Sequence, residues 1–232
     1  MWTGTVSFSG GDRRIDKHGQ QSGRIVDSNN PLALSVTEFA AATADKTPTP
    51  GGGSVAGVVG ALAVALGEMT LNFSKGKKRL AEHEEYYGHL SGRLGRARRM
   101  FQDLVCDDMA AYRLYQQSNR MEDGPEKDEA VQLATAAAIN VPREATKLSL
   151  ALLGDMKELS GRCNTWLITD LLASAALAVA TVTLCDYNVR INIPSLTDKS
   201  AGEQIRQSSA NDVARAKQMH AKIEAAAKQY LP

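Results

Sequence analysis

A turn-forming stretch, Thr47-Pro48-Thr49-Pro50-Gly51-Gly52-Gly53-Ser54, runs directly into the almost uncharged segment Val55-Ala56-Gly57-Val58-Val59-Gly60-Ala61-Leu62-Ala63-Val64-Ala65-Leu66-Gly67. Prolines and glycines prevent regular structure in the first part, and the second predicts a buried helix from Ser54 to about Phe73. Ser54 is a good N-cap residue, because its hydroxyl can accept a hydrogen bond from an N–H of the first turn. Backbone N–H groups at such a helix start can bind an anion, which the helix dipole also favours. The stretch is therefore either an anion cradle or an ordinary capped loop.

Three glycines of this predicted helix, Gly57, Gly60 and Gly67, lie on roughly one face. Each costs about 1 kcal/mol of helix propensity relative to alanine. We therefore expect another part of the chain to approach this face very closely. The stretch is not a nucleotide-binding P-loop, because no Lys-Ser or Lys-Thr pair follows the glycines and no β-rich run precedes them.

The composition is that of a helical protein with a substantial core. Hydrophobic residues make up 43% of the 232 residues and aromatic residues only 5%, which suits closely packed helices better than a β-sandwich. The formal net charge of +1 gives no support to a nucleic-acid partner. The uncharged run from Leu171 to Cys185 is shorter than the roughly 20 residues of a membrane span, so we expect no membrane association.

The three cysteines, Cys106, Cys163 and Cys185, are widely spaced and form no CxxC or Cys/His cluster. This pattern does not predict a metal site, and it favours buried thiols in a reducing compartment. The N-terminus lacks the apolar core of a signal peptide. We therefore expect a cytoplasmic protein.

Long helical segments separated by glycines and prolines predict an all-α fold, a single-domain bundle of long antiparallel helices. We expect residues 1–30 to be a flexible N-terminal extension and residues 31–232 to be one helical domain. The alternating polar and apolar residues of Asn188-Val189-Arg190-Ile191-Asn192-Ile193 predict a short extended stretch ended by Pro194. Helices are predicted over residues 35–43, 54–73, 80–118, 125–160, 164–185 and 202–230.

Two groups of carboxylates are candidates for chemistry. Asp170 lies at the entrance of the most apolar predicted helix, where it is either a helix-start charge or a buried functional acid. Burial raises the pKa of a carboxyl group, which suits proton transfer near neutral pH. Asp107 and Asp108 are adjacent and point about 100° apart on a helix, so at most one faces a site. The alternative for this pair is solvation on a charged helix.

Amide and basic side chains are candidates for binding. Asn188 and Asn192 either hydrogen-bond a polar heterocycle or satisfy backbone groups near the end of a helix. A compact basic cluster either binds an anionic tail or is a solvated turn, and its lack of interleaved aromatics argues against single-stranded nucleic acid. The cluster consists of Lys75, Lys77, Lys78 and Arg79.

Taken in order, these segments resemble the cyclodeaminase/cyclohydrolase family. That family includes the cyclodeaminase domain of formiminotransferase-cyclodeaminase and stand-alone bacterial methenyltetrahydrofolate cyclohydrolases. Pro48 to Ser54 looks like its opening motif, and the resemblance covers roughly residues 35 to 230. The later matches are Met69 to Lys78, Asp107 to Tyr112, Val141-Pro142, Thr169-Asp170 and Asn188 to Asn192.

The resemblance implies an all-helical subunit that forms a homodimer and binds a folate in a cleft near the glycine loop. It implies chemistry on a one-carbon unit that bridges N5 and N10 of tetrahydrofolate. Cyclohydrolases add water to the methenyl carbon and open the ring to 10-formyltetrahydrofolate, whereas cyclodeaminases close 5-formiminotetrahydrofolate and expel ammonia. Both reactions need proton transfer, and neither needs a metal or a redox cofactor.

The resemblance also implies a role for each candidate. Asp170 is expected to transfer protons, assisted by Asp108 or less readily by Asp107, while Asn188 and Asn192 bind the pterin edge. The remaining substrate-binding residues are expected to be the glycine loop Gly51, Gly52, Gly53 and Ser54, the lysines Lys75, Lys77 and Lys78, and Asn164. The chain departs from the family pattern Gly-Asn-x-Asn, because Cys163 replaces the glycine and Trp166 the second asparagine. An indole near Asp170 could reshape or fill the pocket.

Three hypotheses follow from the sequence. The first is a folate enzyme, with the cyclohydrolase slightly favoured because no formiminotransferase domain accompanies the helical part. The second is a catalytically altered protein on the same fold that binds a folate or another anion, and it rests on Trp166 and Cys163. The third is a structural helical oligomer without a ligand.

Overall fold

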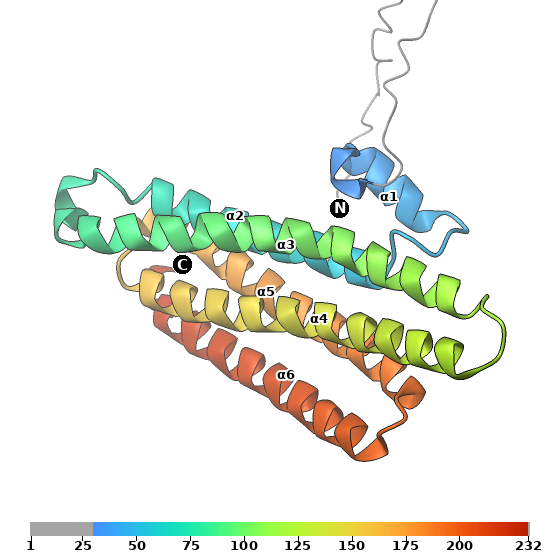
Figure 1. Cartoon of the computed structure of the whole chain (residues 1–232). Helices are drawn as coiled ribbons and strands as arrows, with labels where there is room; N and C mark the ends of the chain where they lie inside the picture. Colours follow the sequence, from blue (N-terminus) through green and yellow to red (C-terminus); the bar gives the residue numbers. More distant parts are fainter. Residues whose placement is uncertain (1–29, 232) are drawn as a thin grey trace, which may run out of the picture.

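Five long helices, α2 to α6, run up and down along one axis, and the short α1 lies across one end of α2 (Figure 1). The structure is a computed structural model that describes residues 30–231, and no residue in this range forms a β-strand. The prediction of an all-α bundle of long antiparallel helices is confirmed. Residues 1–29 of the predicted flexible extension lie outside the described residues. The helices are α1 (Val36–Ala44), α2 (Gly52–Asn72), α3 (Glu84–Ser118), α4 (Pro125–Ser160), α5 (Ile168–Asn192) and α6 (Lys199–Ala227).

Local sequence signals set most helix ends. Ser35 and Glu38 form a capping box at the start of α1, in which each side chain bonds the backbone of the other. Pro125 occupies the first turn of α4, where its missing N–H leaves no hydrogen bond unmade. The side chain of Asp198 accepts a hydrogen bond from the N–H of Ala201 at the start of α6. These signals explain why most predicted bounds lie within a few residues of the observed ones.

The end of α5 differs from the prediction. The segment 188–193 is not extended: α5 continues to Asn192, and Ile193 begins a short 3₁₀ helix. The amide of Asn188 donates to the carbonyl of Leu184, and that of Asn192 donates to the carbonyl of Asn188, both at 2.8 Å. The two buried apolar residues, Val189 and Ile193, are four apart and share one helix face. The alternation that resembled a strand is therefore equally an i, i+4 pattern.

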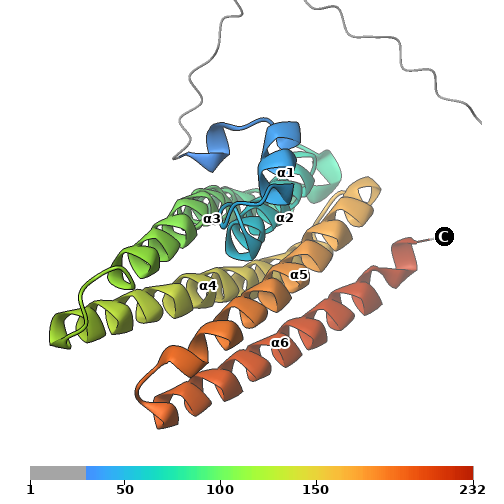
Figure 2. The ribbon, with the colours of Figure 1, turned by 90° about the vertical axis from the view of Figure 1, so that its right-hand side faces the viewer.

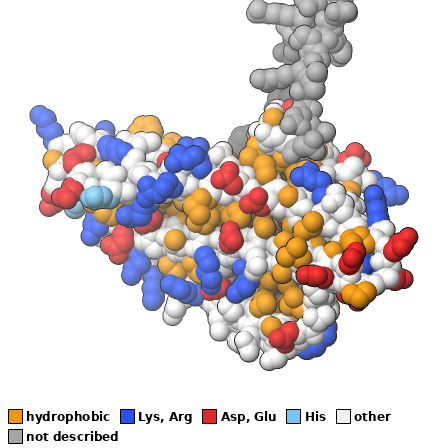
Figure 3. Space-filling model, viewed as in Figure 1, with side chains coloured by type: hydrophobic (Ala, Val, Ile, Leu, Met, Phe, Trp, Pro, Cys, Tyr) orange, Lys and Arg blue, Asp and Glu red, His pale blue; other side chains and the backbone are white. Residues whose placement is uncertain are grey.

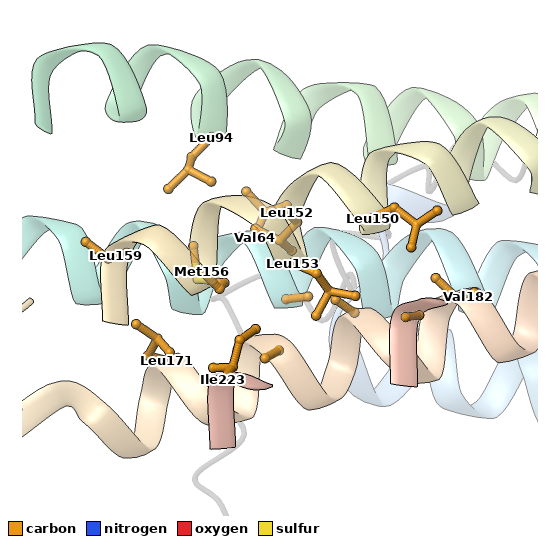
Figure 4. Close-up of a cluster of buried hydrophobic side chains, with 14 of the residues drawn as sticks. Val64, Leu94, Leu150, Leu152, Leu153, Met156, Leu159, Leu171, Val182 and Ile223 are labelled. Atoms are coloured by element: carbon orange, nitrogen blue, oxygen red, sulfur yellow. The ribbon is translucent and has the colours of Figure 1, made fainter. Parts of the chain in front are cut away.

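Helices α2 and α5 lie side by side and antiparallel, with α3 beyond α2 and α6 beyond α5 (Figure 2). Helix α4 packs against both α3 and α5. Fully buried side chains from all five long helices meet in the core, including Val64, Leu94, Leu153, Leu171 and Ile223 (Figure 4). Burying each of these side chains stabilises the fold by about 1.5–3 kcal/mol.

The glycine face of α2 is packed as the sequence predicts. A Cβ atom added to Gly57 would lie 2.6 Å from Cγ2 of Val105, and one added to Gly60 would lie 2.4 Å from the ring of Phe101. A Cβ atom on Gly67 would lie 2.9 Å from Cε of Met156. These distances are too short for real contacts, so α3 approaches the first two glycines and α4 the third because side chains are absent there.

The two most apolar helical segments are long enough to cross a membrane by length and composition alone. Within α2 the most apolar window is 50% buried, and within Thr165–Ser195 it is 39% buried. Both segments supply core residues of the bundle, as expected for core helices. Their other faces remain uncovered within the subunit.

Candidate functional site

The glycine loop places a serine hydroxyl on a distant carboxylate. Helix α2 begins at Gly52, with Gly51 at its N-cap position and no side-chain cap. Ser54 therefore lies inside the first turn, and its Oγ donates a 2.8 Å hydrogen bond to Oδ2 of Asp108 on α3. The prediction that Ser54 caps the helix is wrong, because the helix starts two residues earlier and the hydroxyl has an acceptor 54 positions away in the sequence.

Gly53 allows this contact. A Cβ atom at this position would lie 1.9 Å from Oδ1 of Asp108, so any side chain here displaces the carboxylate. The Asp108 carboxylate thus rests directly on the first turn of α2. That turn carries unpaired N–H groups and the positive end of the helix dipole, both of which favour a negative charge.

Asp108 is a half-buried carboxylate with a perturbed pKa. Burial raises the pKa of Asp108 above the usual aspartate value, and hydrogen bonds from the hydroxyl and backbone N–H of Ser54 partly offset this rise. The neighbouring Asp107 is exposed. Of the two adjacent aspartates, Asp108 is therefore the one that faces the bundle.

A third helix brings amide groups to the same place. The side-chain nitrogen of Asn188 on α5 would lie 3.5 Å from a Cβ atom added to Gly52. The side-chain NH₂ groups of Asn188 and Asn192 are occupied by backbone carbonyls, whereas their Oδ1 atoms have no hydrogen-bond partner among the described residues. We call this convergence of Gly51–Ser54, Asp108 and Asn188 the glycine-loop site, and Asn192 lies one turn further along α5.

The interior wall of the glycine-loop site contains residues that sequence reasoning did not assign to it. A cavity of about 10 Å³ lies behind Gly53 and Asp108, and Pro142 and Cys185 line it. Burial raises the pKa of Cys185 to about 12, so this thiol stays protonated at neutral pH. The Val141-Pro142 motif marked the position of Pro142 in the sequence, but nothing in the local pattern indicated what it faces.

The other candidates gather at the opposite end of α2 and α5. Asn164 is buried and organises the turn before α5: its N–H donates to Oγ of Ser74, and its Oδ1 accepts from Arg79 at 2.7 Å. Trp166 is 86% exposed. Within one subunit the indole therefore lies on the surface and fills no pocket, and its effect on the substrate pocket stays a prediction.

Asp170 lies at this second end and is partly exposed. It occupies the first turn of α5, and its side chain makes no hydrogen bond or ion pair within residues 30–231. Of the two readings of Asp170, the structure matches the helix-start charge rather than the buried acid. The helix between Asp170 and Asn188 spans about 27 Å at 1.5 Å per residue, so one subunit does not bring these two predicted site residues together.

The lysines also lie far from the glycine loop within one subunit. Lys75 follows α2, and its Nζ donates to Oγ of Ser91 at 2.9 Å. Lys77 and Lys78 are exposed on the turn before α3. Helix α2 separates this basic turn from Gly52 by about 30 Å.

A larger groove runs along the outer seam of α3 and α4, where hydrophobic side chains come to the surface (Figure 3). It has a volume of about 500 Å³ and contains none of the predicted site residues. Its lining residues are Met100, Asn140, Arg143, Glu144, Lys147 and Leu148. Within the described part of the chain, no three His, Cys, Asp or Glu side chains come together as a metal site would require.

Comparisons with known proteins agree with this architecture. The family model described as Formiminotransferase-cyclodeaminase matches residues 35–211. A methenyltetrahydrofolate cyclohydrolase from Methylorubrum extorquens is 24% identical over 175 residues, which cover 73% of this chain and 84% of that protein. A formimidoyltransferase-cyclodeaminase from Dictyostelium discoideum is 28% identical over 169 residues, which cover 72% of this chain but only 32% of that protein.

A solved structure shares the fold. The crystal structure of formiminotetrahydrofolate cyclodeaminase from Thermotoga maritima matches with a TM-score of 0.78 and 27% sequence identity. The match covers 84% of this chain and 96% of that one. The region matched by the family model, residues 35–211, includes the glycine loop, helices α2 to α5 and the first part of α6. The chain therefore belongs to the formiminotransferase-cyclodeaminase family.

Proposed function

We propose that this protein is an enzyme of folate one-carbon metabolism that acts on C–N bonds of a tetrahydrofolate derivative. Its activity is that of a methenyltetrahydrofolate cyclohydrolase or a formiminotetrahydrofolate cyclodeaminase. Family membership and the relatives with these two names support the proposal. The observation that carries it is Asp108, held on the glycine loop by Ser54 with a raised pKa.

The cyclohydrolase reaction is the addition of water to a cationic carbon. The oxygen of water bonds to the methenyl carbon, and the Asp108 carboxylate accepts a proton to leave a neutral tetrahedral hydroxyl compound. The bond from this carbon to N5 then breaks as the hydroxyl becomes the formyl carbonyl, and N5 gains a proton. Of the two water protons, one is released and one ends on N5. A carboxyl group with a raised pKa is suited to both transfers.

The cyclodeaminase reaction uses the same group in the same way. The formimino group reacts as its protonated C=NH₂⁺ form: N10 bonds to its carbon and loses its proton to Asp108, which leaves a neutral tetrahedral carbon that carries an NH₂ group. The NH₂ group then takes this proton and leaves as ammonia, and the cationic methenyl bridge remains. Neither reaction transfers electrons to a cofactor, and we propose that none is required. The unpartnered Oδ1 atoms of Asn188 and Asn192 accept N–H groups of the pterin edge.

We further propose a homodimer formed by the uncovered faces of α2 and α5. On α2, Leu62, Met69 and Phe73 recur at helical spacing on the exposed side, and Leu62 is 55% exposed. On α5, the small exposed residues Ala173, Ala176 and Ala180 share one face and carry no charge. An extended apolar surface of this kind is typical of a subunit interface.

A two-fold axis that crosses these helices would place them antiparallel to their copies. The Asp170 end of the partner would then lie near the glycine-loop site. Because one subunit separates the two groups of predicted site residues by about 27 Å, this arrangement is the one that unites them. We propose that Asp170 acts on the substrate of the partner subunit and that Asp108 acts on the substrate of its own subunit.

We also propose a cytoplasmic location, with which the three free thiols are consistent.

Two measurements test this proposal. Absorbance of the methenyl group follows both reactions: it falls as 5,10-methenyltetrahydrofolate opens and rises as 5-formiminotetrahydrofolate closes. We expect the wild type to accelerate at least one change well above the spontaneous rate. Acceleration of neither would refute the assigned activity.

Subunit mixing tests the shared site. Asp108→Asn and Asp170→Asn homodimers are expected to be inactive alone. After exchange, a mixed dimer contains one site with both aspartates intact, so activity should recover to about a quarter of the wild-type value. This figure assumes random exchange, in which half of the dimers are mixed and each has one working site. Inactive variants that exchange subunits without recovery would show that both aspartates serve the same subunit's site.

A further inference from the structure

A pocket with two guanidinium groups opens between the last turns of α5 and the second turn of α6. It has a volume of about 390 Å³ and is lined by Tyr187, Arg190, Ile191 and Arg206. We propose that this pocket binds the p-aminobenzoylglutamate half of the folate substrate. The benzoyl ring lies on Tyr187 and Ile191, and the glutamate carboxylates bind Arg190 and Arg206. This inference rests on the proposed function and assigns residues that neither the sequence motifs nor the comparisons single out.

The two arginines are loosely held by their own helices. Arg190 lies 3.4 Å from Asp186, and Arg206 lies 3.4 Å from Glu203, in each case through a single nitrogen. The pair between Arg93 and Asp155, which joins α3 to α4, measures 2.7 Å. A guanidinium has five N–H donors in a planar fork that suits a carboxylate, so both arginines keep most of their donors available. Among residues 30–231, no acidic side chain lines the pocket.

The other two lining residues offer apolar surface. Tyr187 is 59% exposed and Ile191 is 75% exposed, and they lie four residues apart on one face of α5. Two arginines beside an aromatic ring and an aliphatic side chain match a ligand that combines an aromatic ring with carboxylates. An inorganic anion would use only the arginines.

The position of the pocket fits a substrate whose pterin is at the glycine-loop site. Tyr187 directly precedes Asn188, whose side chain lies against Gly52. A folate carries its carboxylates at the end remote from the pterin, so they need a pocket beside the reaction centre rather than within it. The pocket of Arg190 and Arg206 opens at the same level of α5 as Asn188 in the same subunit.

The lysine turn is the competing partner for the carboxylates. In the proposed antiparallel dimer, the partner's Lys77 and the partner's Lys78 would also lie near the glycine-loop end of α5. These lysines are exposed on a turn and line none of the cavities described above, whereas the arginines share one with apolar walls. The arginine pocket can therefore recognise both the ring and the charge of the ligand.

The test compares substrates with and without the glutamate. Steady-state kinetics are measured with 5,10-methenyltetrahydrofolate and with 5,10-methenyltetrahydropteroate, which lacks the glutamate. Arg190→Gln and Arg206→Gln are each expected to raise KM about tenfold for the first substrate, with little change in kcat, because a charge-assisted hydrogen bond is lost. The rise should be clearly smaller for the second substrate, because it carries only the benzoate carboxylate in place of the two glutamate carboxylates. Arg215→Gln is the matched control, because Arg215 is exposed on the same helix as Arg206 but does not line the pocket.

Two kinetic results would overturn the inference. One is an equal rise of KM for both substrates in the arginine variants. The other is a rise of KM for the glutamate-containing substrate alone that occurs in a Lys77→Gln, Lys78→Gln double variant and not in the arginine variants. Calorimetric titration with N-(4-aminobenzoyl)-L-glutamate separates this inference from the proposed activity. Binding by the wild type that both arginine variants lose supports the pocket even if no turnover is found. Absence of binding to the wild type, or equal binding by all variants, overturns it.

Discussion

At the scale of residues, the decisive feature is the half-buried Asp108 carboxylate, whose lost contacts with water are partly replaced by hydrogen bonds from the protein. Asp108 loses water on folding, which raises its pKa, and the first turn of α2 replaces part of that solvation through Ser54. Gly53 leaves the room for this contact. A carboxylate with a raised pKa is a stronger proton acceptor than an ordinary aspartate, which suits a proton-transfer residue.

The raised pKa of Asp108 predicts a pH dependence of stability. Because the folded state binds the proton more tightly than the unfolded state, ionisation of Asp108 destabilises the fold. The contribution of this group is therefore greatest below the unfolded pKa of about 4 and is lost as the pH rises through the folded pKa. In Asp108→Asn the dependence is absent. We expect the free energy of unfolding of the wild type, relative to this variant, to fall between pH 4 and pH 8 in urea titrations.

The matched control for this titration is Asp103→Asn, which removes an exposed carboxylate of the same helix. It should show no comparable trend relative to the wild type. A wild-type stability that rises relative to Asp108→Asn over the same range would contradict the assignment, since it would require a lowered pKa.

Sequence reasoning identified the residue types of the site but not their partners. The spacing of Asp107 and Asp108 showed that at most one of them faces a site, and the burial of Asp108 in the structure shows which one faces the bundle. The apolar neighbours of Asp170 favoured a buried acid as strongly as a helix-start charge, because a sequence does not show which face of a helix is covered. The contact of Ser54 with Asp108 spans 54 positions, and no local pattern predicts it.

At the scale of elements, the glycines of α2 allow neighbouring helices to approach it closely. Gly57 and Gly60 admit the backbone and side chains of α3, which keeps Asp108 at the start of α2. The sequence predicted this approach correctly, because each glycine has a cost in helix propensity that a close contact must offset. It did not predict the continuation of α5, since an i, i+4 pattern of asparagines and apolar residues also alternates with period two.

A pair of glycine substitutions tests this packing. Gly60→Ala places a Cβ atom 2.4 Å from the ring of Phe101, which is fully buried and has no room to move. We expect a net loss of about 1–3 kcal/mol of stability by overpacking, measured by chemical denaturation. Gly88→Ala in α3 meets no atom within 4 Å and should stabilise the protein by up to about 1 kcal/mol. Equal effects of the two substitutions would show that the close approach of α2 and α3 is absent.

At the scale of the whole molecule, the subunit leaves two apolar helix faces uncovered. The most apolar window is only 50% buried in α2 and 39% buried in the segment that contains α5. Exposure of these apolar faces to water is unfavourable, so we expect a second copy of the subunit to cover them. The same proposed dimer would bring Asp170 of one subunit to the glycine-loop site of the other.

A surface substitution tests the proposed dimer. Leu62→Asp changes a side chain that is already 55% exposed, so the subunit should fold while its interface gains an unpaired charge. Light scattering during size-exclusion chromatography should give the 24.9 kDa subunit mass for this variant and twice that mass for the wild type. Leu133→Asp, on an exposed position of α4, is the control and should remain dimeric. A dimer that survives Leu62→Asp would place the interface elsewhere.

The most direct test of the account measures the loss of 5,10-methenyltetrahydrofolate absorbance and the reverse gain from 5-formiminotetrahydrofolate. It compares wild type with Asp108→Asn at equal concentrations of folded protein. If Asp108 transfers the proton, turnover should fall on the order of 10²-fold or more while folding, checked by circular dichroism, is retained. Near-normal turnover by folded Asp108→Asn would show that the carboxylate on the glycine loop is not the reaction centre.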